Sequence, residues 1–444
     1  MKAVGPRAAR PIPLPSPPAP PTGLAWSRRG ALAGNFALRF AGAATGILLT
    51  RYLAHINDTG RPIGAGVVAL LTAGFYATEL VGSPLLGAVG DRRGRRALLL
   101  LGPLLGALAL GLTAATTLLA VLLLTRLLEG LSAAAAVPAI LGHLGAATDG
   151  DDALRGRALS VFEATTALGT LVGVAAAAGL WLVWGRGAFL VVAAIYLVAA
   201  GCFVPVRDAR APRGTGPWCL SLAALRGQRR LIAFLPGWLC LGAITGLWFS
   251  HGLYQIQVRR PAGAGQMLAG LVAGDDALLF GILLVYALTF GLGALLWGYL
   301  GLRRRREVAV MRIALAAMFG ICATLWALNH SGEGTALRAG LLALSLALLL
   351  VESGFAPAAV AYLARLSGRV AGERGLVLGL YSVVSGGGAL LGAALGAPFA
   401  ARGAIDGVLL ATVLLAAVAL ALIRDEGARD GGEQEGDPGT MRGE

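Results

Sequence analysis

The chain has 444 residues, of which 57% are hydrophobic and only 14% are charged. A soluble domain carries about 25% charged residues, because its folded surface faces water. The composition therefore excludes an ordinary soluble protein and favours a chain whose main solvent is hydrocarbon. The net charge of +14 does not indicate nucleic acid, since the arginines stand between apolar runs and not on one polar face with aromatic residues.

Two ends and one central segment lack the apolar character of the rest. Residues 1–29 contain clustered prolines, so we expect a disordered arm there and do not expect the apolar core of a cleavable signal peptide. Residues 425–444 are rich in glycine and glutamate and are predicted to be a disordered tail. Residues 207–230 hold six arginines and are predicted to be a basic cytoplasmic linker. This linker separates an N-terminal half, 30–206, from a C-terminal half, 231–424.

The two halves contain apolar runs long enough to cross a hydrocarbon core of about 30 Å. The predicted spans are 31–53, 63–88, 96–115, 118–146, 157–180, 187–206, 231–256, 277–301, 307–328, 336–365, 375–398 and 404–424. The sequence thus predicts an all-α integral membrane protein with twelve transmembrane helices.

Arginine is unevenly distributed between the loops, and the richer side of a membrane protein is cytoplasmic. The richer side holds Arg28, Arg29, Arg92, Arg93, Arg95, Arg96, Arg155, Arg157, the linker arginines, Arg303 to Arg306, Arg365, Arg369 and Arg374. The poorer side holds Arg61, Arg186, Arg259, Arg260, Arg338 and Arg402. Both termini are therefore expected to be cytoplasmic, in a multi-pass protein of the bacterial inner (plasma) membrane.

The two halves resemble each other at an offset of 219 positions. The matched positions are Pro138 with Pro357, Arg155–Gly156 with Arg374–Gly375, Phe162 with Tyr381, Gly169 with Gly388 and Gly173 with Gly392. A parallel repeat of this kind predicts two six-helix bundles related by a pseudo-two-fold axis. Gly169 and Gly173, with Gly388 and Gly392, are predicted to be helix-packing positions, because GxxxG spacing places small residues on one face.

The most specific motif follows the second span. It runs Gly87-Ala-Val-Gly90-Asp91-Arg92-Arg93-Gly94-Arg95-Arg96, a tight glycine-containing loop with one acid among four arginines. The corresponding loop of the second half, Gly298-Tyr-Leu-Gly-Leu302-Arg-Arg-Arg-Arg306, keeps the basic run but has leucine at the acidic position. The fourth span contains Arg126-Leu-Leu-Glu129-Gly130.

These motifs resemble those of the major facilitator superfamily over about residues 30–424. The family pattern G-x-x-x-D-R-x-G-R-R is matched at Gly87, Asp91, Arg92, Gly94, Arg95 and Arg96, and Gly90 lies within it. Arg126 to Gly130 is similar to the family's R-x-x-Q-G, with Glu129 in place of glutamine. The resemblance implies two bundles that rock about a central site. It also implies a cytoplasmic latch in which Asp91 faces the helix start near Gly375 and Arg92 pairs with Asp149 or Asp151.

Charged residues inside apolar spans are costly in lipid, so they usually face a cavity or a partner. The candidates for substrate binding or proton coupling are Arg39, Glu79, Arg126, Glu129, Glu163 and Glu352. A carboxyl group in a low dielectric holds a proton more readily than one in water, which makes Glu79, Glu163 and Glu352 candidate proton carriers. The alternative is structural: internal ion pairs such as Arg126 with Glu129, or Arg39 with Glu163.

The residue inventory excludes several chemistries. Lys2 is the only lysine, so neither a phosphate-binding P-loop nor a Schiff-base lysine exists within the spans. The four cysteines form no CxxC pair and the four histidines no HExxH motif, so no metal site and no cofactor are predicted. An enzyme would need a group of catalytic side chains at one membrane face, such as paired His and Asp ligands, and the sequence contains no such pattern, so an enzyme is not predicted.

The sequence therefore predicts a secondary transporter working by alternating access, with a small-molecule substrate and protons as partners and a monomer as its state in the bilayer. Efflux by a proton antiporter is the first hypothesis. The antiporters of the family share G-x-x-x-G-P-x-x-G-G in the fifth span, and this chain has Val174 at the proline position. The alternative is an uptake permease, either a symporter or a uniporter, for an anionic or neutral solute.

Overall fold

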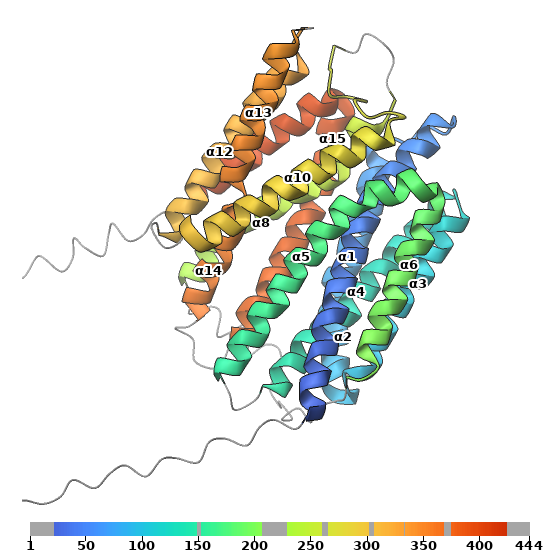
Figure 1. Cartoon of the computed structure of the whole chain (residues 1–444), viewed down its shortest axis with the longest axis vertical. Helices are drawn as coiled ribbons and strands as arrows, with labels where there is room; N and C mark the ends of the chain where they lie inside the picture. The colour runs from blue at the N-terminus through green and yellow to red at the C-terminus, as the bar shows by residue number, and fades with distance from the viewer. Residues whose placement is uncertain are drawn as a thin grey trace, which may run out of the picture.

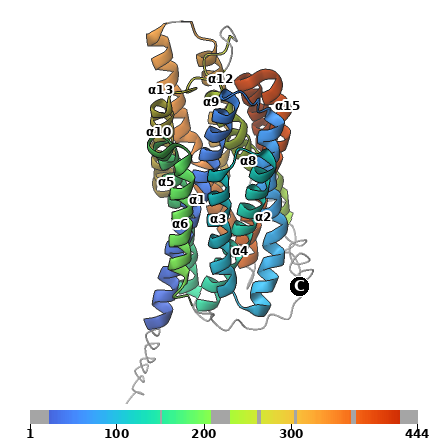
Figure 2. The ribbon, with the colours of Figure 1, turned by 90° about the vertical axis from the view of Figure 1, so that its right-hand side faces the viewer.

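Two groups of helices lie side by side in the molecule. The computed structural model describes residues 22–148, 152–206, 229–259, 265–301, 306–332, 334–367 and 374–423, and these form helices and turns without a strand. Figure 1 shows the blue-to-green helices of the N-terminal half beside the yellow-to-red helices of the C-terminal half, and Figure 2 shows both sets running roughly along the long axis.

The elements follow the chain in order. The first group consists of α1 (Thr22–Asp58), α2 (Ala65–Arg93), α3 (Arg96–Ala115), α4 (Leu119–Ala147), α5 (Asp152–Trp184), the 3-10 turn η1 (Gly185–Gly187) and α6 (Ala188–Phe203). The second group consists of α8 (Arg229–Leu247), the π-helical η2 (Trp248–Gly252), α9 (Leu253–Gln257), α10 (Asp276–Leu296), the π-helical η3 (Trp297–Gly301), α12 (Glu307–Asn329), α13 (Thr335–Glu352), α14 (Phe355–Ser367) and α15 (Arg374–Leu422).

Ten helical stretches of the described residues are long and apolar enough to cross a membrane. Two of them, Arg157–Phe203 and Val383–Leu422, have 47 and 40 residues, whereas one crossing needs about 20. The first of these turns at η1 between α5 and α6. The second contains Ala404, whose φ of 49° is not helical and marks a kink inside α15.

The start of the first helix differs from the expectation. Residues 22–29 belong to α1, although the proline-rich arm was expected to extend to residue 29. The clustered prolines end at Pro21, so the chain is free to be helical from Thr22 onwards. The remainder of the arm, residues 207–228 of the central linker, and residues 424–444, which include the whole C-terminal tail, lie outside the described residues.

The surface and the core have the character of a membrane protein. Large apolar side chains are exposed on the outer faces, with Val183 and Leu295 each 74% exposed. Hydrocarbon is the solvent that tolerates such a surface. The largest buried cluster centres on α1 and α6 and continues into α9 and α10, including Tyr254 and Leu279 of the second group. The two halves therefore share part of one core.

Candidate functional site

The motif loop, residues 87–96, joins α2 to α3. Gly94 ends α2 with a φ of 97°, a conformation that favours glycine, and its N–H donates to Gly90 O at 3.0 Å. Gly90 itself lies against Leu98 of α3, with only 3.0 Å between that side chain and an added Cβ. Asp91 lies in the last turn of α2, and its side chain is outside the described residues.

Two arginines of the motif loop hold the ends of neighbouring helices. Arg95 donates from Nη1 to Gly142 O of α4 at 2.8 Å, and its guanidinium fills the space above Gly142. Arg96 donates from Nη2 to Val204 O, just beyond α6, at 3.3 Å. Both contacts stay within the first group. The loop is thus fixed to its own bundle.

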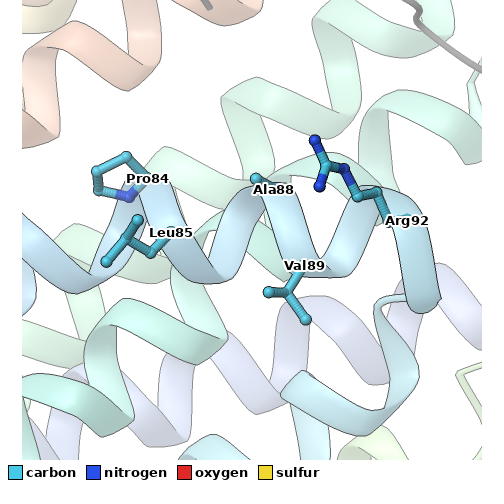
Figure 3. A pocket seen from close by; sticks show the side chains of 5 residues that line it. All are labelled: Pro84, Leu85, Ala88, Val89 and Arg92. Atoms are coloured by element: carbon cyan, nitrogen blue, oxygen red, sulfur yellow. The ribbon is translucent and has the colours of Figure 1, made fainter.

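Arg92 lies in the last turn of α2, before the residues that begin α3. It lines an open pocket of about 390 Å³ together with Pro84, Leu85, Ala88 and Val89. Figure 3 shows these five side chains on successive turns of α2. The partners implied for Arg92, Asp149 and Asp151, lie outside the described residues, and so do the side chains around Gly375. The latch between the halves therefore stays a prediction.

Five charged residues of the first group gather inside it, and we call them the central charge cluster. They are Arg39 of α1, Glu79 of α2, Arg126 and Glu129 of α4, and Glu163 of α5. The buried Tyr196 of α6 interacts electrostatically with four of them, Arg39, Glu79, Arg126 and Glu129. Residues from five helices thus meet in the interior of one bundle.

Within the central charge cluster, Arg126 and Glu129 pair with each other. They form a buried ion pair one helical turn apart, with exposures of 6% and 1%. The Arg126 guanidinium also lies 4.7 Å from the ring centroid of Phe75 on α2, a cation–π contact. Glu129 Oε1 has no partner among the described residues. This is the structural pairing that the three-residue spacing suggests.

Arg39 is arranged differently. It interacts electrostatically with Glu79 and with Glu163, but it forms no ion pair or hydrogen bond within the described part of the chain, and its Nε is buried without a partner. The alternative of a direct Arg39–Glu163 ion pair is therefore not observed. A guanidinium that interacts with two carboxylates but has no direct partner has donors available for a ligand.

Glu352 lies in the second group, apart from the central charge cluster. It is the last residue of α13 and interacts electrostatically with Tyr286 of α10. Among the described residues it has no ion-pair or hydrogen-bond partner and no interacting cation. The structure thus separates the predicted charged set into one cluster and one isolated acid.

The four packing glycines lie at two helix crossings. A Cβ on Gly169 of α5 would come within 2.6 Å of Phe36 O and 3.0 Å of Arg39 Cβ, and one on Gly173 would meet the Phe40 backbone. In the second group, a Cβ added on Gly388 would lie 2.5 Å from Leu239 O, and one added on Gly392 would meet the Ala243 backbone, so α15 crosses α8 as α5 crosses α1. Small residues allow both close approaches.

Sequence reasoning missed two further polar features. Asn35, fully buried and one turn before Arg39, donates to Thr165 Oγ1 at 3.0 Å and Thr166 Oγ1 at 2.9 Å on α5. Arg51 of α1 forms an ion pair with Asp276 of α10. The asparagine inside the first span could have been recognised from the sequence as a buried polar residue. The Arg51–Asp276 pair could not have been predicted from the sequence, because its partners are 225 residues apart.

The Arg51–Asp276 pair belongs to a set of contacts that bridge the two groups at one end of the molecule. Tyr254 donates to Ile63 O at 2.7 Å, and Gln257 donates from Nε2 to Thr50 Oγ1 at 3.2 Å. The Arg259 N–H donates to Asp58 Oδ1 at 3.3 Å. These contacts lie where α1 ends and α2 begins, whereas the motif loop follows the other end of α2. We call this set the bridging contacts.

No group of three or more metal-ligating side chains occurs among the residues that the structure describes. The site is instead an interior polar site, flanked by a bridged end and by a motif loop at the other end. Together with the membrane-crossing helices, it defines a multi-pass membrane transporter.

The family model described as the Major Facilitator Superfamily matches residues 31–284. The chain belongs to this superfamily, whose members are transporters and not enzymes. Two similar solved structures are crystal structures of the nucleoside transporter NupG and of a mutant of it. Each is 14% identical to this chain, and each alignment covers 89% of this chain. The TM-score is 0.65 for NupG, with 97% of its chain covered, and 0.66 for the mutant, with 98% of its chain covered. Curated protein sequences give no match.

Proposed function

We propose that the protein is an uptake permease that carries a small polar metabolite by alternating access, coupled to protons. The observation that carries the proposal is Arg39, a guanidinium inside the first bundle that interacts electrostatically with Glu79 and Glu163 and has no direct partner among the described residues. Such a site can bind a hydrogen-bond acceptor and take up or release a proton in the same place. The two structural neighbours are nucleoside transporters, carriers of a metabolite, which favours a permease over drug efflux.

The proposed architecture has twelve crossings in two related bundles. Division of the two long stretches at η1 and at Ala404 gives twelve spans. The repeat is supported by matched neighbours. Gly87 lies 3.6 Å from Pro138 and Gly298 lies 3.8 Å from Pro357, each measured from an added Cβ. The motif-loop glycine of each half therefore meets the equivalent proline.

In the proposed topology the motif loop faces the cytoplasm, because the arginine-rich loops lie at its end. Both termini are then cytoplasmic, and the bridging contacts lie on the outer face of the bacterial inner membrane. With Arg51 paired to Asp276 there, the structure corresponds to a state closed to the outside. Substrate entry requires this pair to break, and the motif loop would close the cytoplasmic face in exchange.

The charge balance around Arg39 favours a neutral acceptor group over an anionic one at that position. Arg126 is committed to Glu129, so Arg39 is the guanidinium left for a ligand, and it already has two carboxylates beside it. A free anion would add a third negative charge to this environment. A neutral acceptor group, such as a carbonyl or a hydroxyl oxygen, adds none.

The test is uptake into proteoliposomes with an imposed pH gradient and a panel of labelled metabolites, with nucleosides first. We expect gradient-dependent uptake of at least one solute. We also expect Arg39→Gln to lower that uptake by about tenfold or more, the equivalent of losing one charge-assisted hydrogen bond. The matched control is Arg365→Gln, which removes an arginine that is 49% exposed at its side chain, outside the cluster. Gradient-driven export with no uptake of any solute would restore the efflux hypothesis.

A further inference from the structure

The second bundle contains an acid that the transport mechanism above does not use. Glu352 ends α13, and the described part of the chain provides it with no cation, hydrogen bond or ion pair. A carboxyl group inside a membrane protein is costly unless something compensates for its charge. The compensating group must therefore be a proton or a ligand.

The position of Glu352 is fixed by a close helix crossing. An added Cβ on Gly293 of α10 would meet Ser353 Oγ and would lie 2.8 Å from Leu350 O, so the end of α13 lies directly on α10. Tyr286 lies seven residues before Gly293, two turns along α10 and on the same face. This register explains why Glu352 interacts with Tyr286.

Aromatic rings from two elements surround Tyr286. Its ring centroid lies 6.4 Å from that of Phe249 in an edge-on arrangement and 5.8 Å from that of Phe290 in a stacked one. Phe249 belongs to η2, a π-helical turn, and such turns often occur at functional sites. The neighbouring Trp248 points the other way and donates to Thr412 Oγ1 of α15 at 2.9 Å. The π-helical turn thus directs Phe249 towards α10.

Two of the three rings pack against the core that the two bundles share. Phe249 and Tyr286 pack, partly buried, against the buried cluster that centres on α1 and α6 and extends into α10. The side chains of Tyr286, Phe290 and Glu352 are likewise only partly buried. A lipid-facing position would not place Tyr286 against the core that joins the two halves. A ligand between the bundles would therefore contact this group.

We infer that Glu352, Tyr286, Phe249 and Phe290 form a binding subsite for the protonated amine of a solute that also carries a planar or apolar ring. Carboxylate and aromatic faces attract the same kind of group, an organic cation, the first by charge and the second through the ring quadrupole. The rings add a surface on which a flat ligand can stack. The inference rests on the proposed transport function and adds its substrate class. A solute whose amine lies at Glu352 and whose acceptor oxygen lies at Arg39 contacts both bundles.

The experiment compares two probes of the same shape, 2-phenylethylamine and 2-phenylethanol, which differ in the positive charge. Binding to the purified full-length protein in detergent is measured by calorimetry at neutral pH, without a gradient. We expect the amine to bind about tenfold or more tightly than the alcohol, because it gains a charge-assisted contact. Equal affinities would overturn the inference and leave Glu352 as a group that carries only a proton.

Three variants locate the subsite. Glu352→Gln should remove the preference for the amine, and Tyr286→Leu should weaken binding of both probes. Tyr286→Phe should keep the preference, because it retains the ring. The control is Glu307→Gln, since Glu307 pairs with Arg365 at 3.2 Å outside the group, and it should bind as the unaltered protein does. Retention of the amine preference in a folded Glu352→Gln protein, judged by size-exclusion profile and thermal unfolding, would overturn the assignment.

The two proposals fail in different ways. If the unaltered protein shows no amine preference but takes up solute in proteoliposomes, the subsite is ruled out and the permease proposal stands. Amine binding that depends on Glu352, in a protein that moves no solute of the panel, would keep the subsite and remove the permease.

Discussion

At the scale of single residues, the interior charges have two different environments. Arg126 and Glu129 satisfy each other, whereas Arg39 and Glu352 have no direct partner in the described chain. Sequence spacing could predict the first case, since residues three apart on a helix share a face. It could not predict the second, because the distance between Arg39 and Glu163 depends on how α1 crosses α5.

The burial of the Arg126–Glu129 pair leads to a prediction about the stability of the fold. Arg126→Gln leaves a carboxylate that is 1% exposed without its counter-charge, so it should destabilise the fold by about 3–5 kcal/mol. The double variant Arg126→Gln with Glu129→Gln should recover much of that loss, since two amides can bond to each other. Thermal unfolding in detergent measures both. A double variant as unstable as the single one would contradict the ion-pair interpretation.

At the scale of elements, glycine decides where helices approach closely. Gly169 allows α5 to lie on the backbone of α1 beside Phe36 and Arg39. The crossing therefore fixes the height of Arg39 as well as the packing of the two helices. The sequence predicts the small-residue face through its GxxxG spacing, but only the structure identifies α1 as the partner helix.

The close packing of α5 on α1 can be tested by adding one methyl group at Gly169. Gly169→Ala would press against Phe36 O and Arg39 Cβ, so we expect it to cost about 1–3 kcal/mol and to lower transport by displacing Arg39. The matched control is Gly46→Ala in α1, where an added Cβ meets no atom within 4 Å. This control should be neutral or slightly stabilising, because alanine favours a helix. Equal effects of the two substitutions would show that the crossing is not tight.

At the scale of the whole molecule, the bridging contacts join the bundles at one end. Arg51 is 6% exposed and meets Asp276 across the two groups, supported by the hydrogen bonds of Tyr254 and Gln257. In the alternating-access cycle that we propose, each state keeps at least one end closed, and the ion pair would stabilise closure at this end. Breaking the pair would then shift the population towards the state open at this end.

Spin labels can follow that shift. We place them at Thr59→Cys and Ala277→Cys, two exposed positions beside the pair, in a background with the native cysteines replaced by serine. Asp276→Asn should move the distance distribution between the labels towards longer values. Asp275→Asn is the control, because Asp275 caps α10 by accepting from Leu278 N at 2.8 Å and does not bridge the halves. A similar shift in both variants would assign the effect to the helix cap.

The sequence by itself determined the apolar environment, the all-helical class and the family. A long apolar run indicates directly that a helix lies in hydrocarbon, and the motif from Gly87 to Arg96 is a continuous segment. Both features can therefore be recognised from the sequence alone. The tertiary structure decided which interior charges are paired, which end is bridged and which acid interacts with Tyr286. Those properties depend on distances between helices far apart in the chain, such as α1 with α10 or η2 with α10, and no local pattern encodes such distances.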